Sequence, residues 1–306
     1  MAGIFVFSED SALAKQLLTP ALELKKSLSQ PIVALAVSAA SAKELAALGA
    51  DKAVVLKDGN WVEGLAEAIY SQVNEAQGSV LLVGGTLRGK HVASYVAAKL
   101  DAGMTTDAKT VTVEGGKLVA TRVLYAGLAI CEEEISLPAV ATIRARTFLA
   151  PAAAPAAGAV ETINVAGEPR VTVDAVTPTG GTGVDITTAN KLVSVGRGFH
   201  KKEDLKLAEE LAAVLKAELS CSRGIAEDEH WLPIERYIGI SGQTVKPDLY
   251  LATGLSGQVQ HMVGCRESKV IVAVNNDERA PIFEAADYGI VGDLYTVLPL
   301  LTAALK

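Results

Sequence analysis

The strongest constraint on the fold of this chain is a repeated alternation of apolar, strand-like runs with helical segments. In the first hundred residues the apolar runs are Ile4–Phe7, Ile32–Val37, Lys52–Leu56 and Val80–Val83. The segments between them carry apolar residues at helical spacing, as Leu65, Ile69 and Val73 do. Strands that alternate with helices in this way form a parallel sheet covered by helices, so the pattern predicts an α/β fold.

A second series of the same kind begins at Leu192 and includes an expected strand at Tyr237–Ile240, so we expect two α/β domains. The 306 residues exceed the usual size of one compact core. A glycine-rich break at Thr179–Gly183 precedes the second series and marks the boundary. We therefore predict an N-terminal α/β domain over residues 1–185 and a doubly wound C-terminal domain over residues 186–306.

Two stretches of the N-terminal domain depart from the regular alternation. After a helix over about Lys90–Leu100, short β-type runs predict antiparallel additions to the sheet. These runs are Lys109–Val113, Lys117–Val123, Glu134–Ile135 and Ala139–Ile143. Farther on, Ala150–Gly158 contains two prolines, which lack the amide hydrogen that a continuous helix needs. We expect this second stretch to be a linker or the start of an arm.

The charge and hydropathy patterns argue against two classes of partner. The chain has 28 Lys and Arg against 35 Asp and Glu, a net charge of −7, and no basic stripe that could neutralise a nucleic-acid backbone. No apolar stretch reaches the roughly 18 residues of a membrane helix, and no leader precedes the first strand-like run. We expect a soluble cytoplasmic protein with no membrane insertion. Cys131, Cys221 and Cys265 are scattered and are expected to be buried thiols.

The turns that follow the strands of the second series are the candidate binding residues, because ligands of an open parallel sheet bind at the carboxyl ends of its strands. These turns are Gly196–Gly198, Cys221–Gly224, Gly239–Gly242, Gly254–Gly257, Asn275–Asp277 and Gly292–Asp293. Glycines let the backbone approach a ligand and expose amide hydrogens to a phosphate. Turn geometry alone also favours such residues, but packing does not require Arg197, Arg223 and His261 there. The pattern therefore indicates a nucleotide site.

The common catalytic and nucleotide-binding motifs are absent from the sequence. Neither G-x-G-x-x-G nor G-x-x-x-x-G-K-[ST] occurs. No Ser-His-Asp order, pair of catalytic carboxylates or His/Cys metal cluster can be assembled. We therefore expect no catalytic residue and no metal. His261 follows the Gly254–Gly257 turn in the first turn of a helix, where its side chain can point at the ligand of that turn.

The second series resembles the electron-transfer flavoprotein alpha-subunit family over about Leu192–Leu305. The segments that carry the resemblance are Leu249–Gly264, which reads LYLATGLSGQVQHMVG, Val270–Asn275 and Ala280–Asp293. This long ordered set is more specific than a short motif. The N-terminal half fits the other domain of the family in length and element order.

The resemblance implies that the C-terminal domain binds FAD in an extended pose. Contacts with the flavin or its phosphates are expected from Arg197, Ser222 and Arg223. Contacts along the ring are expected from Ile238, Gly239, Ile240 and Ser241. Contacts around the ribityl chain and ring are expected from Ser256, Gly257, Gln258, Val259, Gln260 and His261. The pyrophosphate and adenosine end is expected to meet Asn275, Asp293 and Leu294.

Three of these residues have more specific implied positions. Arg223 should lie beside the isoalloxazine ring, the Ser241 hydroxyl near N5, and His261 opposite the C2 carbonyl. The family often has Gln-Thr where this chain has Ile240-Ser241. A hydroxyl for N5 is retained but an amide is lost, so the flavin potential need not match that of other members.

The resemblance also implies a heterodimer, in which the N-terminal domain packs against a separate electron-transfer flavoprotein beta subunit. The implied role is that of an electron carrier rather than a substrate-converting enzyme. It would accept electrons from flavin dehydrogenases and pass them to a quinone- or ferredoxin-linked acceptor. Two alternatives stay open: the alpha subunit of an electron-bifurcating or NADH-reactive electron-transfer flavoprotein, and a redox-silent nucleotide-binding regulatory subunit.

Overall fold

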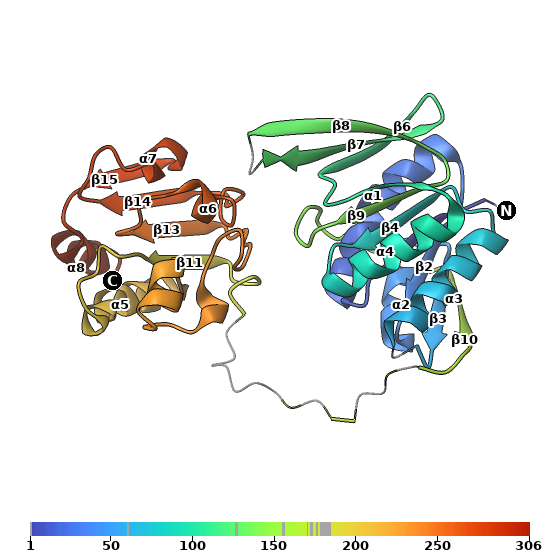
Figure 1. Ribbon diagram of the computed structural model, residues 1–306, viewed down its shortest axis with the longest axis horizontal. Coiled ribbons are helices and arrows are strands. Elements are labelled where there is room, and N and C mark those ends of the chain that lie inside the picture. The colour runs from blue at the N-terminus through green and yellow to red at the C-terminus, as the bar shows by residue number, and fades with distance from the viewer. Residues whose placement is uncertain are drawn as a thin grey trace. The chain divides into compact units, whose positions relative to one another are not determined.

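The computed structural model divides the chain into two compact units, Met1–Asp174 and Ala175–Lys306. It describes residues 2–59, 61–125, 128–154, 157–169, 171, 174–175, 177 and 185–306. The glycine-rich break at Thr179–Gly183 lies outside these residues, so the domain boundary at 185 and 186 stays a prediction. Each unit is α/β, as predicted (Figure 1). Within the described residues, no helix combines the length and apolarity needed to cross a membrane.

The first unit is built on a parallel sheet of seven strands in the order β10-β3-β2-β1-β4-β9-β5. The strands are β1 (Ile4–Phe7), β2 (Ile32–Ala36), β3 (Lys52–Lys57), β4 (Val80–Gly84), β5 (Gly103–Thr105), β9 (Ala139–Ile143) and β10 (Ala159–Asn164). The central strand β1 pairs on both sides, with Val6 opposite Ala34 and Leu82. Both faces of the middle of this sheet are therefore buried, which explains its continuous apolar strands.

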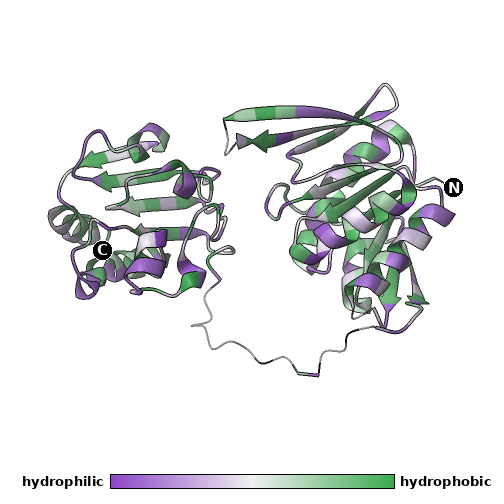
Figure 2. Ribbon diagram, viewed as in Figure 1, coloured by the Kyte–Doolittle hydropathy of each residue, from purple (hydrophilic) through white to green (hydrophobic). Residues whose placement is uncertain are grey.

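Helices cover both faces of this sheet. They are α1 (Ser11–Leu28), α2 (Ala39–Ala47), α3 (Val62–Glu75) and α4 (Leu87–Leu100). Leu17 of α1 packs in one core with Val6, whereas Ile69 of α3 packs in the other with Phe5. Neighbouring residues of β1 thus serve opposite cores, because successive side chains of a strand point to opposite faces. Figure 2 shows hydrophobic residues along the strands of both units.

Three of the four segments expected as antiparallel additions form a separate antiparallel sheet. Its strands are β6 (Thr110–Glu114), β7 (Lys117–Leu124) and β8 (Ala129–Ser136), in that order. The expectation for the fourth segment, Ala139–Ile143, was wrong, because this segment is β9 and pairs in parallel with β4 and β5. All five residues of β9 are buried. The run AVATI is apolar except for Thr142, whose hydroxyl accepts the amide of Asp107 at 2.9 Å, and such a run suits an interior parallel strand once strands lie on both sides of it.

Of the two interpretations of Ala150–Gly158, a linker or the start of an arm, neither fits its described residues, which are held within the first unit. The amide of Ala154 donates to the carbonyl of Ala47 at 2.8 Å, and the amide of Gly158 donates to that of Ala46 at 3.1 Å. The chain then enters β10, which pairs with β3 at the edge of the sheet. The stretch is a connection inside the first unit that runs along the end of α2.

The second unit contains a five-stranded parallel sheet in the order β12-β11-β13-β14-β15. Its strands are β11 (Lys191–Val195), β12 (Glu218–Cys221), β13 (Leu249–Thr253), β14 (Ile271–Asn275) and β15 (Tyr288–Val291). Numbered within the unit, the order is 2-1-3-4-5. The connection from β11 to β12 runs one way along the sheet, and the connection from β12 to β13 runs back past β11. The prediction of a doubly wound domain is confirmed, with its switch point between β11 and β13.

Helices also cover both faces of the second sheet. They are α5 (Lys206–Leu215), α6 (Val259–Met262), α7 (Ile282–Ala285) and α8 (Leu294–Ala304), with short turns η2 (Lys202–Leu205), η3 (Gly224–Asp228) and η4 (Ile234–Arg236). Leu211 of α5 and Leu298 of α8 share one core, and Ile282 of α7 belongs to the other. Cys221 and Cys265 are buried as expected, but Cys131 is only partly buried.

The expected strand Tyr237–Ile240 is not formed. This segment makes only isolated bridges, between Cys221 and Tyr237 and between Ile238 and Gln243. The chain turns back at once, because the amide of Gly239 donates to the carbonyl of Gln243 at 3.2 Å. Gly239 has φ 154°, a conformation that side chains disfavour. The apolar pattern was strand-like, but Gly239 inside the segment and Gly242 after it close a loop.

The burial of α1 residues in the first unit predicts how much stability is lost when one of their side chains is truncated. Leu17 is fully buried, so Leu17→Ala should lower the free energy of unfolding by about 2–5 kcal/mol through lost contacts and a residual cavity. Leu87→Ala is the matched control, because Leu87 is 91% exposed and its loss should change stability by about 0.5 kcal/mol or less. Urea unfolding followed by circular dichroism measures both, and equal losses would contradict this packing.

Candidate functional site

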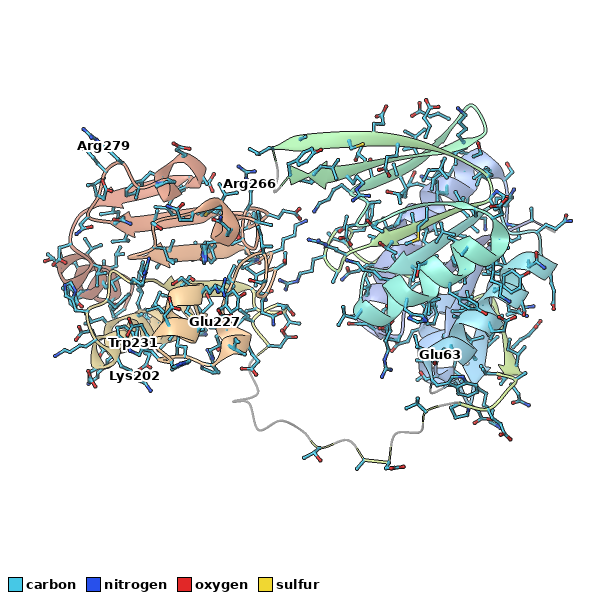
Figure 3. All side chains as sticks on the ribbon, in the orientation of Figure 1. Glu63, Lys202, Glu227, Trp231, Arg266 and Arg279 are labelled. Atoms are coloured by element: carbon cyan, nitrogen blue, oxygen red, sulfur yellow. The ribbon has the colours of Figure 1, made fainter. Side chains whose placement is uncertain are left out.

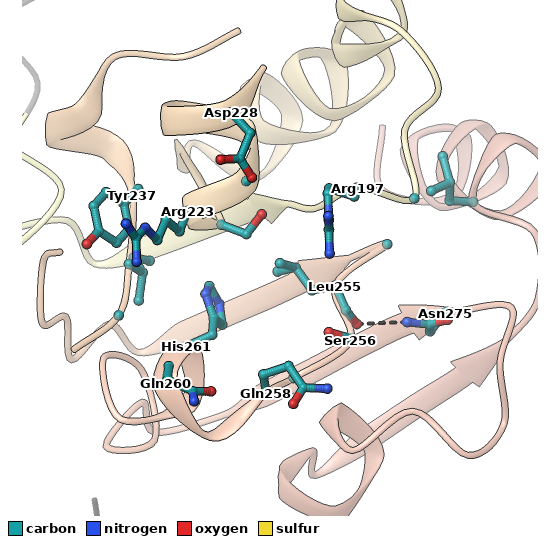
Figure 4. Close-up of a pocket in the computed structure, with 18 of the residues that line it drawn as sticks. Arg197, Arg223, Asp228, Tyr237, Leu255, Ser256, Gln258, Gln260, His261 and Asn275 are labelled. Carbon is teal, nitrogen blue, oxygen red and sulfur yellow. Dashed lines mark hydrogen bonds between the residues drawn. The ribbon is translucent and has the colours of Figure 1, made fainter. Parts of the chain in front are cut away.

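A cavity of about 610 Å³ opens at the carboxyl ends of the second sheet, around the switch point between β11 and β13 (Figure 4). Its size is typical of a site for a small molecule or cofactor. The predicted contact residues that line it are Arg197, Ser222, Arg223, Ile238, Gly239, Ile240, Ser241, Ser256, Gly257, Gln258, Gln260, His261, Asn275, Asp293 and Leu294. The fold therefore brings residues from turns far apart in sequence to one place.

One predicted contact residue does not line the cavity, and several lining residues were not predicted. Val259 opens α6 with its side chain 52% exposed and is not part of the lining. The additional lining residues are Gly198, His200, Gly224, Asp228, Tyr237, Gly254, Leu255 and Asn276. Most belong to turns already identified, so turn membership was the usable signal. Tyr237 had none, because its segment resembled a strand.

Two glycine turns cross at the switch point and shape the floor of the cavity. The amide of Gly198, after β11, donates to the carbonyl of Gly254, after β13, at 3.0 Å. Gly254 has φ 61°, and a Cβ atom added there would lie 2.9 Å from the Cα atom of Gly198. At Gly257, with φ 77°, an added Cβ atom would lie 2.4 Å from the Cα atom of Ile282. Only glycine allows these approaches.

The turn after β13 presents unpaired backbone donors to the cavity. Within the described residues, no acceptor is found for the amide hydrogens of Ser256, Gly257 and Gln258. All three residues line the cavity. Consecutive amides of this kind are suited to the oxygens of a phosphate or a ring carbonyl.

Two arginines supply positive charge at the cavity. Arg197 lines it and forms no ion pair with any carboxylate of the described residues. Its aliphatic stem lies over Gly224, where an added Cβ atom would be 3.0 Å from the Cδ atom of Arg197. Arg223 is paired instead, through its Nε atom, with Glu227 one turn later on η3. Figure 3 shows Glu227 in the second unit. An anionic ligand thus meets one unpaired cation and one that is already partly neutralised.

His261 rises from α6 into the cavity lining (Figure 4). Tyr250 of β13, which does not line the cavity, holds the His261 ring from behind. The hydroxyl of Tyr250 lies 2.6 Å from Nε2 of His261. Burial lowers the pKa of His261 to about 4, against a smaller effect of the Ile238 backbone, so the ring is neutral near pH 7. Burial also raises the pKa of Tyr250 well above 10, so the phenol keeps its proton.

The Tyr250 contact fits either tautomer of the neutral His261 ring, because the phenol can donate to Nε2 or accept from it. Nδ1 is buried and makes no hydrogen bond of good geometry in the described part of the chain, although the Ile238 backbone acts on the ring and raises its pKa against the effect of burial. A buried ring nitrogen in this position is costly unless a ligand or a small movement satisfies it. This is consistent with the expected position of His261 against a polar atom of the ligand.

Ser241 also has a tyrosine behind it. Tyr237 is 3% exposed, and its hydroxyl donates to the Oγ atom of Ser241 at 2.5 Å. Both residues line the cavity. The Ser241 hydroxyl therefore faces the cavity with its oxygen already accepting one hydrogen bond.

At the other end, Asn275 and Asp293 are engaged in holding the turns themselves. Asn275 donates through Nδ2 to the carbonyl of Leu255 at 2.7 Å and accepts the amide of Asp277 at 2.9 Å. Asp293 caps α8 by accepting the amide of Tyr295 at 3.3 Å. Both line the cavity, but these bonds give them a role in the shape of the turns in addition to any contact with a ligand.

The arrangement fits a dinucleotide that carries a flat polar ring. Free amides and Arg197 suit phosphate oxygens, and neutral donors at Ser241 and His261 suit the nitrogen and carbonyl atoms of a ring. These groups bind, orient and polarise a ligand.

Comparison with known proteins agrees with this geometry. The chain matches the family model described as "Electron transfer flavoprotein FAD-binding domain" over residues 185–266, and that described as "Electron transfer flavoprotein domain" over residues 6–168. It is 41% identical over 312 residues to Protein FixB of Escherichia coli O157:H7, covering 99% of this chain and 97% of the relative. Protein FixB of Shigella flexneri is similar to the same extent, also at 41% identity with 99% and 97% coverage.

The buried state of His261 predicts a pH dependence of stability. The unfolded state binds a proton below about pH 6.5, whereas the folded state resists protonation down to about pH 4. The unfolded state therefore binds more protons between these values, and the free energy of unfolding should rise with pH across this window, by about 3 kcal/mol in total. In the protein without ligand, His261→Gln should remove most of this rise.

Urea unfolding at pH 4.5, 5.5, 6.5 and 7.5 measures this effect. His230→Asn is the matched control, because His230 is an exposed histidine of the same unit with φ 53°, which asparagine tolerates. It should keep the slope of the parent. Equal slopes for His261→Gln and the parent would contradict the burial described for His261.

Proposed function

This chain belongs to the electron transfer flavoprotein family as an FAD-binding, alpha-type subunit, and we propose that it carries electrons from flavin dehydrogenases to a quinone- or ferredoxin-linked acceptor. Membership of this family implies a heterodimer with a beta subunit. The observation that supports a carrier role is the chemistry of the cavity, which offers positive charge, free amides and neutral donors around a ligand. We also propose the cytoplasm as its compartment and the boundary at residues 185 and 186.

Bound FAD supplies the redox chemistry, and the residues of this chain tune and hold it. We assign the free amides of Ser256, Gly257 and Gln258, together with Arg197, to the negatively charged and carbonyl groups of the cofactor. The Gly198–Gly254 crossing fixes the depth at which the cofactor lies. Because these donors belong to turns held by backbone bonds, they need little rearrangement when charge changes nearby.

The ring end of the cavity has its own set of tuning groups. We assign Arg223, Ser241 and His261 to the isoalloxazine ring, and Ile238 to Ile240 to its edge and face. A cation stabilises negative charge that develops on reduction, and the neutral donor at His261 does so more weakly. Glu227 opposes Arg223, since the two side chains form an ion pair. The reduction potential of the bound flavin should therefore depend on both the positive charge of Arg223 and the negative charge of Glu227.

Reconstitution with the cognate beta subunit tests the proposed function. The purified complex should be a one-to-one heterodimer, yellow from one bound FAD, and reducible by a flavin dehydrogenase. Light scattering and absorbance measure the stoichiometry. Two flavins in each heterodimer would point to the electron-bifurcating or NADH-reactive alternative. A colourless or redox-silent complex would contradict the carrier role and favour the regulatory subunit.

Removing either member of the Arg223–Glu227 ion pair should shift the reduction potential of the flavin, in opposite directions for the two residues. Arg223→Gln removes the cation and should lower the reduction potential of the bound flavin. Glu227→Gln removes the opposing carboxylate and should raise it, because the Arg223 charge is then unopposed. Asp293→Asn keeps the α8 cap, since asparagine caps as well as aspartate. It should weaken FAD retention and leave the potential nearly unchanged.

Spectroelectrochemical titration of the three variants beside the parent measures these shifts, and dialysis against buffer measures retention. Glu227→Gln and Asp293→Asn preserve side-chain size, and Arg223→Gln shortens a side chain that is 68% exposed, so packing changes little in all three variants. Shifts of the same sign for Arg223→Gln and Glu227→Gln would show that the pair does not act through charge. A shifted potential in Asp293→Asn with none in Arg223→Gln would reverse the proposed orientation of the cofactor.

A further inference from the structure

Tyr237 has an unusual place among the residues that line the cavity, because it is buried and yet reaches a cavity-facing hydroxyl. Only 3% of its surface is exposed, and its ring packs in the core formed by α5, α8 and the strands. Its hydroxyl donates to Oγ of Ser241 at 2.5 Å. Figure 4 shows Tyr237 at the same end of the cavity as Arg223.

The loop over residues 238–243 is built around the ring of Tyr237. A Cβ atom added at Gly242 would lie 2.4 Å from the Cε2 atom of Tyr237, so the backbone rests directly on the ring. The amide of Gln243 donates to the carbonyl of Tyr237 at 2.8 Å, which closes the loop at its base. The amide of Ile240 donates to the carbonyl of Gln260 at 2.8 Å, which ties the loop to α6. Ser241 is thus held in reach of the phenol by the backbone.

The direction of this hydrogen bond constrains the proton of Ser241. A serine hydroxyl has one proton and two acceptor lone pairs. The Tyr237 proton occupies one lone pair, which disfavours rotamers of the serine proton that point back toward the phenol. No described residue accepts the Ser241 proton, and the side chain lines the cavity. Ser241 is exposed in the absence of a ligand, so the directions left for that proton lead away from Tyr237 to the cavity and its solvent, and a ring bound there meets it.

We propose that Tyr237 is a positioning residue that turns the Ser241 hydroxyl proton into the cavity and makes Ser241 a fixed hydrogen-bond donor to the bound ring. The inference rests on the proposed function, because it takes the isoalloxazine ring as the occupant beside Ser241. Tyr237 itself acts through Ser241. Its phenol ring also supports the loop, and that structural role is separate from the role of its hydroxyl.

A fixed donor has a predictable effect on the potential. It stabilises the form of the ring whose facing atom is a hydrogen-bond acceptor, which for a flavin ring nitrogen is the oxidised form. A freely rotating hydroxyl can also accept a hydrogen bond from the N–H that full reduction adds. Tyr237 therefore holds the potential of the complete reduction below the value that an unrestrained serine would allow.

A double-mutant cycle on the holo heterodimer tests this inference. Tyr237→Phe keeps the ring under the loop and removes only the hydroxyl, so FAD should stay bound and the potential of complete reduction should rise. Ser241→Ala removes the donor. In the Ser241→Ala background, adding Tyr237→Phe should produce no further shift, because the tyrosine acts through the serine.

Tyr288→Phe is the matched control, since Tyr288 lies on β15 with 67% exposure and does not line the cavity. It should titrate like the parent. An unchanged potential in Tyr237→Phe would overturn the proposal, as would a Tyr237→Phe shift that persists in full beside Ser241→Ala. A lower potential in Tyr237→Phe would also overturn it.

A measurement without cofactor separates this inference from the proposed function. In protein labelled with ¹³Cζ-tyrosine, the Tyr237 signal should move on Ser241→Ala, and the Tyr288 signal should not. An unmoved Tyr237 signal means that the pair does not exist, and the proposal falls even if FAD binds. A moved signal in a heterodimer that binds no FAD means instead that the pair exists but the proposed function is wrong.

Discussion

The crossing of two glycine turns at the switch point of the second sheet is the constraint on which the site depends. The backbone of Gly198 reaches that of Gly254 only because neither residue carries a Cβ atom. This approach lets the turns after β11 and β13 share one cavity, and it leaves the amides of the second turn facing inward. A larger residue at either position would push the two turns apart. The free amides and the side chains proposed to meet the ring would then lose their common frame.

Around that frame, each polar side chain at the ring end has a partner behind it. Tyr250 lies behind His261, Tyr237 behind Ser241, and Glu227 pairs with Arg223. These partners hold the side chains in place, occupy one of their hydrogen-bonding positions or offset part of their charge. In a partly buried site, these hydrogen bonds and charges have a larger effect on the energy of a bound ligand than they would in water, because the local dielectric constant is lower. The chain can therefore adjust a flavin potential without changing the residues that touch the cofactor.

The sequence alone was a good guide to elements and turns and a poor guide to segments whose environment is unusual. The alternation of apolar runs and helical spacing predicted both α/β units, and the glycine turns together with the family resemblance predicted most of the residues that line the cavity. Ala139–Ile143 was assigned to an antiparallel addition, because its local pattern does not show that two parallel strands enclose it. The strand expected at Tyr237–Ile240 failed for the opposite reason, since loop-closing bonds overrode a strand-like pattern.

What the sequence determined by itself was the architecture and the chemistry of the turns, because hydrophobic periodicity and glycine placement act locally. The family likewise follows from long ordered segments such as Leu249–Gly264. What only the tertiary structure decided was which side chains are paired, buried or left without a partner. The Tyr237–Ser241 bond joins residues near in sequence, but it needs a loop folded over a buried ring. The neutrality of His261 needs burial in a protein interior, and no local pattern encodes desolvation.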